Sequence, residues 1–485
     1  NKLKKLRDFD HIEDYPMPQN FKGELRPYQK AGYNWMRFLQ EYHFGGCLAD
    51  DMGLGKTVQT LSVLQQQKEL EDTKYASLLI MPTSLLYNWE TEAKKFTPDL
   101  KVLVYTTTER NKNINEYFSD YDIILTSYGI ARIDVDILKT YYFNYIILDE
   151  SQAIKNPSSH ISRAVKQLKS TFRLILTGTP IENTTLDLWS QLSFANTGLL
   201  GSQAFFKNEY QYPIEKKQDV AKTKRLHSII KPFILRRTKS QVAKELPQKI
   251  EHIHLSVMSE QQEKIYEEEK SYYRNQILEH IETKGIAKSQ VILLQGLIKL
   301  RQIANHPLMI DENYEGDSGK LRDVKHRLVS AVSKNHKILV FSQFVKHLTI
   351  IRKMLDELEI PYAYLDGSTK NRQAEVGKFQ NNEDIKVFLL SIKTGGVGLN
   401  LTAADYVFIL DPWWNPAVEM QAIDRAHRIG QENKVFIYKF ISKNTIEEKI
   451  LALQKEKTRL VTDLITTEAS FFKNLSRADI DELLG

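Results

Sequence analysis

The sequence has a single cysteine, Cys47, among its 485 residues. One cysteine forms no internal disulfide and no paired-cysteine metal site, so disulfide-stapled folds and zinc ribbons are excluded. No apolar run reaches the ~20 residues that span a bilayer, which argues against a membrane partner. We therefore expect an intracellular protein, in the cytoplasm or nucleoid of a bacterium or in the nucleus of a eukaryote.

The chain also lacks an initial Met and any apolar signal core behind its polar, basic residues 1–7. It is therefore expected to be a piece of a longer protein. Low-complexity segments are missing too, and the balance of 42% hydrophobic and 26% charged residues excludes a disordered tail. Lys and Arg exceed Asp and Glu by 67 to 61, a mild excess that permits a nucleic-acid partner without requiring one.

What the sequence does contain is a series of short, unbroken apolar runs separated by helical patterns. Continuous rather than alternating runs are typical of strands buried on both faces of a parallel sheet. Two groups of such runs predict two α/β lobes. The runs lie at 46–49, 78–81, 102–105, 123–126, 145–148 and 174–177, and then at 338–341, 362–365, 387–390, 407–410 and 436–438.

A glycine-containing loop, Asp50-Asp51-Met52-Gly53-Leu54-Gly55-Lys56-Thr57, follows the first predicted strand and precedes a helical run at 58–67. This is the context of a phosphate-binding loop, in which Gly53 and Gly55 let backbone amides face phosphate oxygens. Lys56 would reach the β- and γ-phosphates of ATP, and the Thr57 hydroxyl would bind Mg²⁺. The first glycine of the full phosphate-binding string is replaced by Asp50, so an ordinary glycine-rich turn is the alternative.

Two carboxylates, Asp149 and Glu150, end the apolar run at 145–148. The carboxyl edge of a parallel sheet is where such folds bind ligands. Asp149 would therefore hold Mg²⁺, and Glu150 would orient and deprotonate an attacking water. The alternative is a helix N-terminus with acidic residues in its first turn.

The second lobe contains a polar segment with two arginines. Gln421, Arg425 and Arg428 are spaced four and three residues apart, so a helix would place them on one face. Arginines of this kind can stabilise the charge that develops on a γ-phosphate during transfer. The alternative is a surface helix with salt bridges.

Taken together, these motifs resemble those of the SWI/SNF-type ATPases of helicase superfamily 2, over about residues 21–484. The resemblance rests on eight segments in the family's order, of which Asp424-Arg425-Ala426-His427-Arg428-Ile429-Gly430-Gln431 is the most specific. They lie at 25–29, 51–57, 149–152, 176–183, 391–401 and 424–431, with branch-specific segments at 232–239 and 300–307.

The resemblance implies a role for Gln29 as the reader of the adenine base. It also implies that residues 176–183 link the state of ATP to DNA contact. Two residues depart from the family pattern. Gln152 stands where histidine is more common and can still bridge to residues 176–183 by hydrogen bonds, and Lys393 stands where arginine is common.

The resemblance further implies the helicase core of a larger protein, with two RecA-like lobes. Lobe 1 would occupy residues 1–250 with a helical insertion at about 186–245. Lobe 2 would occupy 251–485. Within it we expect a helical insertion at about 258–310, a core at about 320–445 and a C-terminal helical brace at about 446–485.

A DNA groove should then cross the lobes on the side opposite the insertions. Its candidate contacts are mostly small hydroxyl side chains and loop amides, which suit phosphates and carry no base code. Trp414 is either a groove residue or a core residue, and the basic stretch 216–225 can equally be a solvated helix face. The candidates are Thr83, Ser84, Ser127, Ser342, Gln343, Ser368, Lys393, Thr394 and Trp414.

The resulting hypothesis is a DNA-stimulated ATPase that needs ATP and Mg²⁺ and moves along double-stranded DNA as a monomeric motor, without sequence specificity and without separating the strands. Its cargo would be a DNA-bound protein, such as a nucleosome or RNA polymerase. The alternatives are a strand-separating helicase and an ATP-gated DNA-binding platform with weak turnover.

Overall fold

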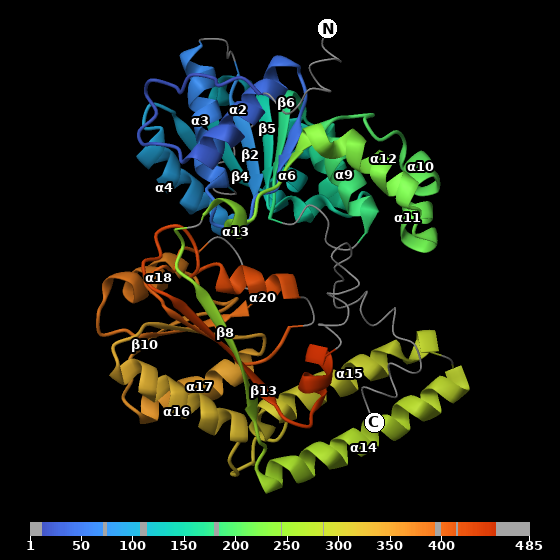
Figure 1. Cartoon of the computed structure of the whole chain (residues 1–485), viewed down its shortest axis with the longest axis vertical. Coiled ribbons are helices and arrows are strands. Elements are labelled where there is room, and N and C mark those ends of the chain that lie inside the picture. Colours follow the sequence, from blue (N-terminus) through green and yellow to red (C-terminus); the bar gives the residue numbers. More distant parts are fainter. Residues whose placement is uncertain are drawn as a thin grey trace. The chain divides into compact units, whose positions relative to one another are not determined.

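The computed structural model describes residues 12–70, 75–106, 114–178, 184–243, 245–284, 286–392, 399–413 and 416–452. The chain divides into two compact units, Asn1–Lys244 and Glu245–Gly485. Each unit contains one sheet with helices around it, and every strand pair in both sheets is parallel (Figure 1). The predicted α/β class with two parallel-sheet lobes is confirmed.

The division lies a few residues before the expected boundary at 250/251. Its cause is strand β8 (Lys249–Ser256), which pairs along its whole length with β13 (Val435–Ser442). This pairing makes β8 part of the second sheet.

The first sheet has seven strands in the order β3-β4-β2-β5-β6-β1-β7. Strands β2 and β4 are buried at every position, as expected for apolar runs covered by helices on both faces. The strands are β1 (Gly46–Leu48), β2 (Ser77–Met81), β3 (Val102–Tyr105), β4 (Ile123–Ser127), β5 (Tyr142–Asp149), β6 (Lys169–Leu176) and β7 (Ile234–Leu235).

The helices of the first unit include a group after β6, over 185–242, where a helical insertion was expected. The α-helices are α2 (Pro27–Glu41), α3 (Lys56–Glu69), α4 (Leu86–Phe96), α5 (Ile114–Phe118), α6 (Tyr128–Ile133), α7 (Val135–Leu138), α8 (His160–Gln167), α9 (Thr185–Ala195), α10 (Gln203–Phe206), α11 (Tyr212–Lys217), α12 (Val220–Ile230) and α13 (Lys239–Val242). Short non-α turns are η1 (Thr83–Leu85), η2 (Ser151–Ile154), η3 (Lys207–Gln211) and η4 (Lys231–Phe233).

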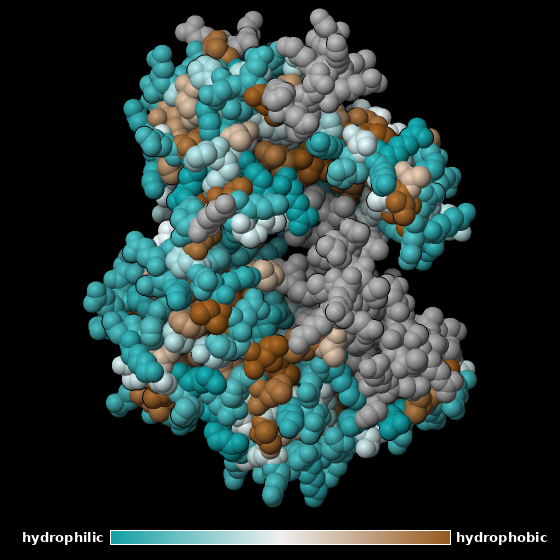
Figure 2. Space-filling view, in the orientation of Figure 1, coloured by the Kyte–Doolittle hydropathy of each residue, from teal (hydrophilic) through white to brown (hydrophobic). Residues whose placement is uncertain are grey.

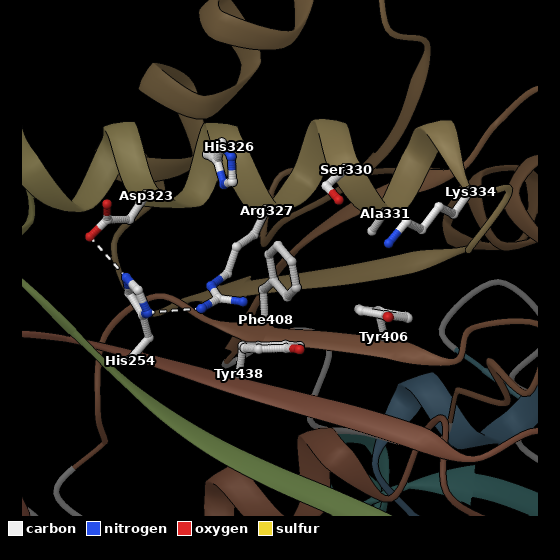
Figure 3. A pocket seen from close by; sticks show the side chains of 10 residues that line it. All are labelled: His254, Asp323, His326, Arg327, Ser330, Ala331, Lys334, Tyr406, Phe408 and Tyr438. Atoms are coloured by element: carbon white, nitrogen blue, oxygen red, sulfur yellow. Dashed lines mark hydrogen bonds and ion pairs between the residues drawn. The ribbon is translucent and has the colours of Figure 1, made fainter.

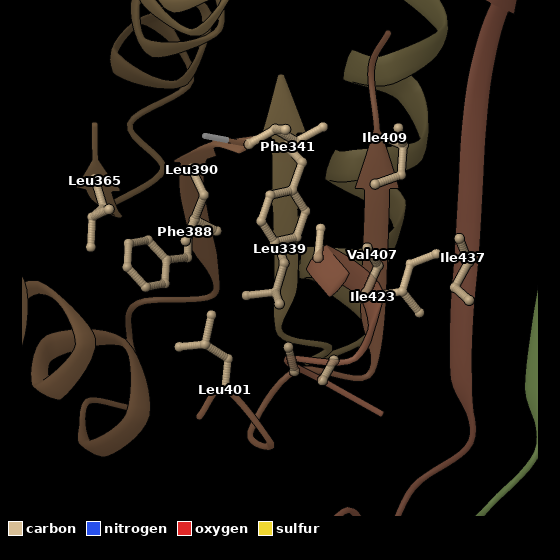
Figure 4. Close-up of a cluster of buried hydrophobic side chains, with 14 of the residues drawn as sticks. Leu339, Phe341, Leu365, Phe388, Leu390, Leu401, Val407, Ile409, Ile423 and Ile437 are labelled. Atoms are coloured by element: carbon tan, nitrogen blue, oxygen red, sulfur yellow. The ribbon is translucent and has the colours of Figure 1, made fainter. Parts of the chain in front are cut away.

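The second sheet has six strands in the order β10-β11-β9-β12-β13-β8. Leu339, Phe388 and Val407 pack into the cluster shown in Figure 4, while their neighbours Val340 and Leu389 belong to a separate cluster. Because successive side chains point to opposite faces, both faces are apolar and the sequence runs are continuous. The strands not yet named are β9 (Ile338–Ser342), β10 (Tyr362–Leu365), β11 (Val387–Ser391) and β12 (Tyr406–Ile409).

Two long helices, α14 (Glu260–Lys284) and α15 (Ile286–Asn305), form a hairpin beside this sheet (Figure 1). The region was expected to hold a helical insertion. The other elements are η5 (Pro307–Met309), α16 (Gly319–Ser333), α17 (Val345–Glu357), α18 (Arg372–Asn381) and α20 (Pro416–Ile423). Residues 446–452 are helical, and the rest of the expected brace, 453–485, lies outside the described residues.

All eleven strands expected from apolar runs are confirmed, whereas β7 and β8 were missed. β7 has only two residues. β8 is an edge strand whose side chains are mostly exposed, and it mixes His252 and His254 with Ile253 and Leu255. Hydrophobic side chains accordingly lie on the surface over β8 (Figure 2). No helix in the described part of the chain has the length and apolar character to cross a membrane.

Candidate active site

The loop between β1 and α3 has the backbone that a phosphate-binding loop requires. Gly53 and Gly55 adopt positive φ angles of 82° and 81°, which other residues rarely do. A Cβ atom on Gly55 would also lie 2.5 Å from Nε2 of Gln29. Helix α3 begins at Lys56, so the predicted strand, loop and helix order is confirmed.

The Lys56 side chain folds into this loop. Its Nζ donates to the backbone oxygen of Asp50 at 2.7 Å. Thr57 lies in the first turn of α3 and is partly buried. The side chains of Lys56 and Thr57 therefore lie at the N-terminus of α3. An anion bound there could contact them and the first backbone amides of the helix together.

Asp50, which replaces the first glycine of the string, is fully buried and ion-paired with Arg237. Arg237 donates its Nε to Asp50 Oδ1 at 2.9 Å and one Nη2 hydrogen to Gln59 at 2.9 Å. It also bonds to the backbone oxygen of Tyr28. Asp50, where the string has its first glycine, thus forms a buried ion pair that connects the loop to residues 232–239.

Gln29 is buried on α2 against the same loop. Its Oε1 accepts from the backbone amide of Arg26 at 2.9 Å, and its Nε2 donates to the backbone oxygen of Leu54 at 3.1 Å. A longer bond of 3.4 Å runs from the same Nε2 to the Tyr28 hydroxyl. Both N–H groups are therefore engaged, and the remaining hydrogen-bonding capacity of the amide is a lone pair on Oε1.

Asp149 is the last residue of β5, and its carboxylate is held by two donors. Trp89 Nε1 donates to Oδ2 at 2.8 Å, and the amide of Glu150 donates to Oδ1 at 2.9 Å. Burial, together with the neighbouring charge of Glu150, raises the pKa of Asp149 to about 6, although the Lys56 ammonium acts in the opposite direction. A divalent cation would relieve both unfavourable effects.

Glu150 has a positive φ of 49°, unusual for a residue with a side chain and frequent at functional sites. Its side chain caps no helix; instead it accepts from Gln152 Nε2 at 2.8 Å. Thr177 in turn donates to Gln152 Oε1 at 3.5 Å. The expected bridge from Gln152 to the segment 176–183 is therefore present, whereas residues 179–183 lie outside the described part.

The second unit corrects one expectation. Helix α20 ends at Ile423, so it includes Gln421 but neither Arg425 nor Arg428. The backbone tightens there, because the amides of Arg425 and Ala426 each bond three residues back. Arg425 is buried at 2% exposure, and Arg428 is partly buried in the turn that follows. The prediction of one helical face was wrong, since these tight turns replace the helix.

Hydrogen bonds from the side chains of Gln431 and His427 hold the turns that follow α20. Gln431 Nε2 donates to the backbone oxygens of Thr402, Ala404 and Ala426, at 3.1, 2.8 and 3.1 Å. His427 Nε2 lies 2.8 Å from the Pro247 oxygen. His427 and Gln431 therefore both hold these turns, and Gln431 is a loop-organising residue that the sequence argument did not single out.

The predicted DNA contacts fall into three groups. Thr83 and Ser368 are exposed and Ser84 partly so, but the Ser368 hydroxyl already donates to Asp366 Oδ1 at 2.6 Å. Ser127 caps α6 by accepting from the Ile130 amide at 3.2 Å. Lys393, Thr394 and Trp414 lie outside the described residues.

The prediction that Ser342 contacts DNA was wrong. It is fully buried and donates to the buried Asp411, which also accepts from the amide of Gln343 at 3.0 Å. A buried serine with a committed hydroxyl has no surface for a phosphate, so only its partly buried neighbour Gln343 stays a prediction. The basic stretch 216–225 is exposed for the most part, and Lys222 pairs with Glu209.

Sequence reasoning missed Trp89 and Arg237 as supports of this site. Trp89 lies on α4, far from Asp149 in sequence, and looks like an ordinary core residue. Arg237 lies in a segment that was recognised only by resemblance. Nothing local in the sequence signals either contact, because each depends on the order of strands in the sheet.

The SNF2-related domain family matches residues 28–309, more than half of the chain. The chain belongs to the SNF2-related family. A second family, the helicase conserved C-terminal domain, matches residues 319–430. The resemblance drawn from the motifs is therefore confirmed. The first match covers most of the first unit and continues to residue 309 in the second, and the second match lies within the second unit.

Relatives across bacteria and eukaryotes are similar to nearly the whole chain. The putative ATP-dependent helicase/translocase YwqA of Bacillus subtilis is 38% identical over 493 residues, which cover 99% of this chain and 53% of YwqA. The TATA-binding protein-associated factor MOT1 of Saccharomyces cerevisiae is 33% identical over 551 residues, covering 99% of this chain and 29% of MOT1. The chain thus spans about half or less of these relatives.

Among solved structures, the SWI2/SNF2 ATPase core of Sulfolobus solfataricus in complex with double-stranded DNA is 41% identical. The alignment covers 97% of this chain and 99% of that one, with a TM-score of 0.48.

Proposed function

We propose that this SNF2-related protein is an ATP-driven translocase on double-stranded DNA. The observation that carries the proposal is the bonded chain from Glu150 through Gln152 to Thr177, beside a phosphate-binding loop with its lysine in place. This chain joins the residues suited to hydrolysis to the segment that the family resemblance links with DNA contact.

Each site residue has a proposed role. Gln29 reads the adenine base, the amides around Gly53 and Gly55 hold phosphates, and Lys56 binds the β- and γ-phosphates. Glu150 deprotonates the attacking water. Arg425, Arg428 and Gln421 would approach the γ-phosphate from the second unit, where an arginine is worth about 10³–10⁵ in rate.

Magnesium fits the donors present. Thr57 offers a hydroxyl and Asp149 a carboxylate, and such hard oxygen ligands suit this ion. When bound, the ion neutralises charge on the phosphates. The protein's own contribution is orientation, because Trp89 and the Glu150 amide fix both oxygens of Asp149.

The partner is proposed to be double-stranded DNA bound through its phosphates without base readout. The hydroxyls of Thr83 and Ser84 would contact it directly, and Ser368 would do so only by giving up its bond to Asp366. The protein would act as a monomeric motor that displaces a DNA-bound protein, such as a nucleosome or RNA polymerase. A strand-separating helicase and an ATP-gated platform with weak turnover are the competing functions.

These functions are separated by measuring phosphate release with duplex DNA, with single-stranded DNA and without DNA. Stimulation by the duplex, together with displacement of a third strand from a triplex and no unwinding of a plain duplex, is expected for the translocase. Unwinding of the plain duplex would favour the helicase. Binding of DNA without stimulated turnover would favour the platform.

The roles of Lys56 and Arg428 are tested by alanine variants. Lys56→Ala should lose hydrolysis. Arg428→Ala should bind ATP normally and lose DNA-stimulated hydrolysis by at least 10³-fold if it acts as a finger. The matched control is Arg322→Ala, which removes an exposed arginine from the same unit. Unchanged turnover in Arg428→Ala would defeat its assigned role.

A further inference from the structure

A cavity of about 450 Å³ opens in the second unit between helix α16 and strands β8, β12 and β13 (Figure 3). Its size lies within the ~300–1,000 Å³ of small-molecule pockets. No residue of the proposed ATPase site lines it. The lining residues that matter below are His254, Asp323, His326, Arg327, Ser330, Lys334, Tyr406 and Tyr438.

The floor of the cavity carries two tyrosine rings, and the ring of Phe408 stands steeply to both, at 68° to Tyr406 and 78° to Tyr438. The rings of Tyr406 and Tyr438, on neighbouring strands, are inclined by only 11°, with centroids 6.0 Å apart. The Arg327 guanidinium lies over Tyr438, 4.7 Å from the ring centroid. The ring of Tyr406 lies on the floor below Ala331 and Lys334 (Figure 3). The floor therefore offers a ring-sized seat at Tyr406 beside a fixed cation.

Arg327 is held in place by a relay of hydrogen bonds. It donates to Nδ1 of His254 at 3.1 Å, and Nε2 of the same ring lies 3.0 Å from Asp323 Oδ2. Because arginine has no acceptor, His254 Nδ1 must accept and Nε2 must donate. A pre-positioned guanidinium loses little entropy when it binds a phosphate.

The cavity is also lined by polar side chains other than those of this relay. The side chains of Lys334, His326 and Ser330 make no hydrogen bond or ion pair with any residue in the described ranges. In Figure 3, Lys334 and Asp323 lie at opposite ends of the lining. The Lys334 ammonium therefore lies at one end of the lining, and His326 lies near the other end, beside the Asp323 carboxylate that is bonded to histidine (Figure 3).

We infer that this cavity binds a nucleotide unit, with its base on Tyr406 and its phosphate between Arg327 and Lys334. Proteins hold unpaired nucleotides by stacking the base on an aromatic ring and by pairing the phosphate with cations. An acidic peptide would use the cations but would not stack on the ring of Tyr406. The source of the unit is either a free nucleotide or an unpaired strand of nucleic acid.

The cavity is separate from the predicted DNA contacts of the same unit. Tyr406 is the first residue of β12, and Lys334 lies just before β9, so both lie near the amino ends of strands. Gln343 and Ser368 follow the carboxyl ends of β9 and β10. In a parallel sheet these are opposite edges, so the inference does not depend on the proposed DNA path.

Equilibrium dialysis of the whole chain against AMP tests the inference, because AMP lacks the β- and γ-phosphates assigned to Lys56. An eight-nucleotide single strand forms the second arm. Saturable binding is expected, about tenfold weaker in Lys334→Gln and in Tyr406→Leu. Tighter binding of the strand than of AMP would identify an unpaired strand as the source, and equal binding would identify free nucleotides.

The matched control is Lys325→Gln, which removes the same charge from an exposed position of α16 that does not line the cavity. It should bind within twofold of wild type. The inference is overturned if neither probe binds saturably, if Lys325→Gln loses as much affinity as Lys334→Gln, or if Gln29→Ala, at the proposed adenine-binding residue, abolishes binding that Lys334→Gln leaves unchanged.

Discussion

At the residue scale, the pair of Asp50 and Arg237 shows how a departure from a motif can be compensated. Asp50 has no exposed side-chain surface, and Arg237 has 11%. Breaking a buried ion pair on one side leaves an uncompensated charge, which costs more than the pair contributes. The pair also joins the phosphate-binding loop to α2, because Arg237 bonds to Tyr28.

Arg237→Gln is therefore expected to destabilise the protein by about 3–5 kcal/mol, since it leaves the Asp50 carboxylate buried without its cation. Denaturant unfolding of the nucleotide-free protein measures this. In the double variant Asp50→Asn, Arg237→Gln the loss should be smaller than in Arg237→Gln alone. A cost below 1 kcal/mol for the single variant would show that the pair is not coupled to folding.

Asp149 leads to a prediction about pH. Its pKa is raised from 3.8 to about 6, first by burial and then by the charge of Glu150. The folded protein therefore binds more protons than the unfolded chain between these two values, and its stability falls as the pH rises through this window.

Asp149→Asn should remove this fall in stability with rising pH, because asparagine does not ionise. We expect the variant to be more stable than wild type at pH 8 by about 2–3 kcal/mol, from about 1.4 kcal/mol per pKa unit, and equal to it near pH 4. Unfolding curves without magnesium or nucleotide, at several pH values, measure the difference. Asp356→Asn, at an exposed position, is the control. A pH-independent difference would contradict the burial argument.

At the scale of elements, the hairpin of α14 and α15 has a core of its own. Leu293, Leu297 and Leu300 pack with Tyr266 and Ile277 in one cluster, which also includes Ile446 and Ile450 near the end of the described chain. This cluster is distinct from the two clusters of the sheet. The hairpin is therefore a semi-independent packing unit whose stability depends on its own leucines.

Leu297→Ala is expected to cost about 2–5 kcal/mol locally, because the side chain is fully buried and leaves a cavity. Hydrogen exchange should accelerate in α14 and α15 and stay slow in β9 and β11. Val291→Ala, at 66% exposure on the same helix, should change stability by less than about 0.5 kcal/mol. Uniform acceleration across the sheet would argue against a separate hairpin core.

At the scale of the whole molecule, the proposed DNA contacts lead to a salt prediction. Contacts that go to phosphates release counterions, so the logarithm of affinity falls linearly with the logarithm of salt concentration, by about 0.9 per phosphate for duplex DNA. We expect the DNA concentration for half-maximal ATPase stimulation to rise steeply between 50 and 200 mM salt. Turnover without DNA should change little. A flat salt response would contradict phosphate-based binding.

Strand positions and the phosphate-binding loop could be predicted because both are local. Apolar runs such as 123–126 are continuous where both faces are buried, and the loop glycines are required by backbone angles. The edge strand β8 could not be predicted in this way, since its exposed face removes the apolar signal. The end of α20 at Ile423 could not be predicted either. The spacing of Gln421, Arg425 and Arg428 fits a continued helix as well as it fits the tight turns that the structure shows.

The sequence by itself determined the α/β class, the order of the motifs and the residue types suited to ATP chemistry. Only the tertiary structure decided which distant side chains bond to the predicted site residues. Trp89 bonds to Asp149, Arg237 bonds to Asp50, and Asp411 bonds to Ser342, which the sequence had assigned to DNA. The physical reason is that backbone angles and apolar periodicity depend on residues that are neighbours in the sequence. Partners of buried polar groups depend instead on which strands the sheet brings side by side.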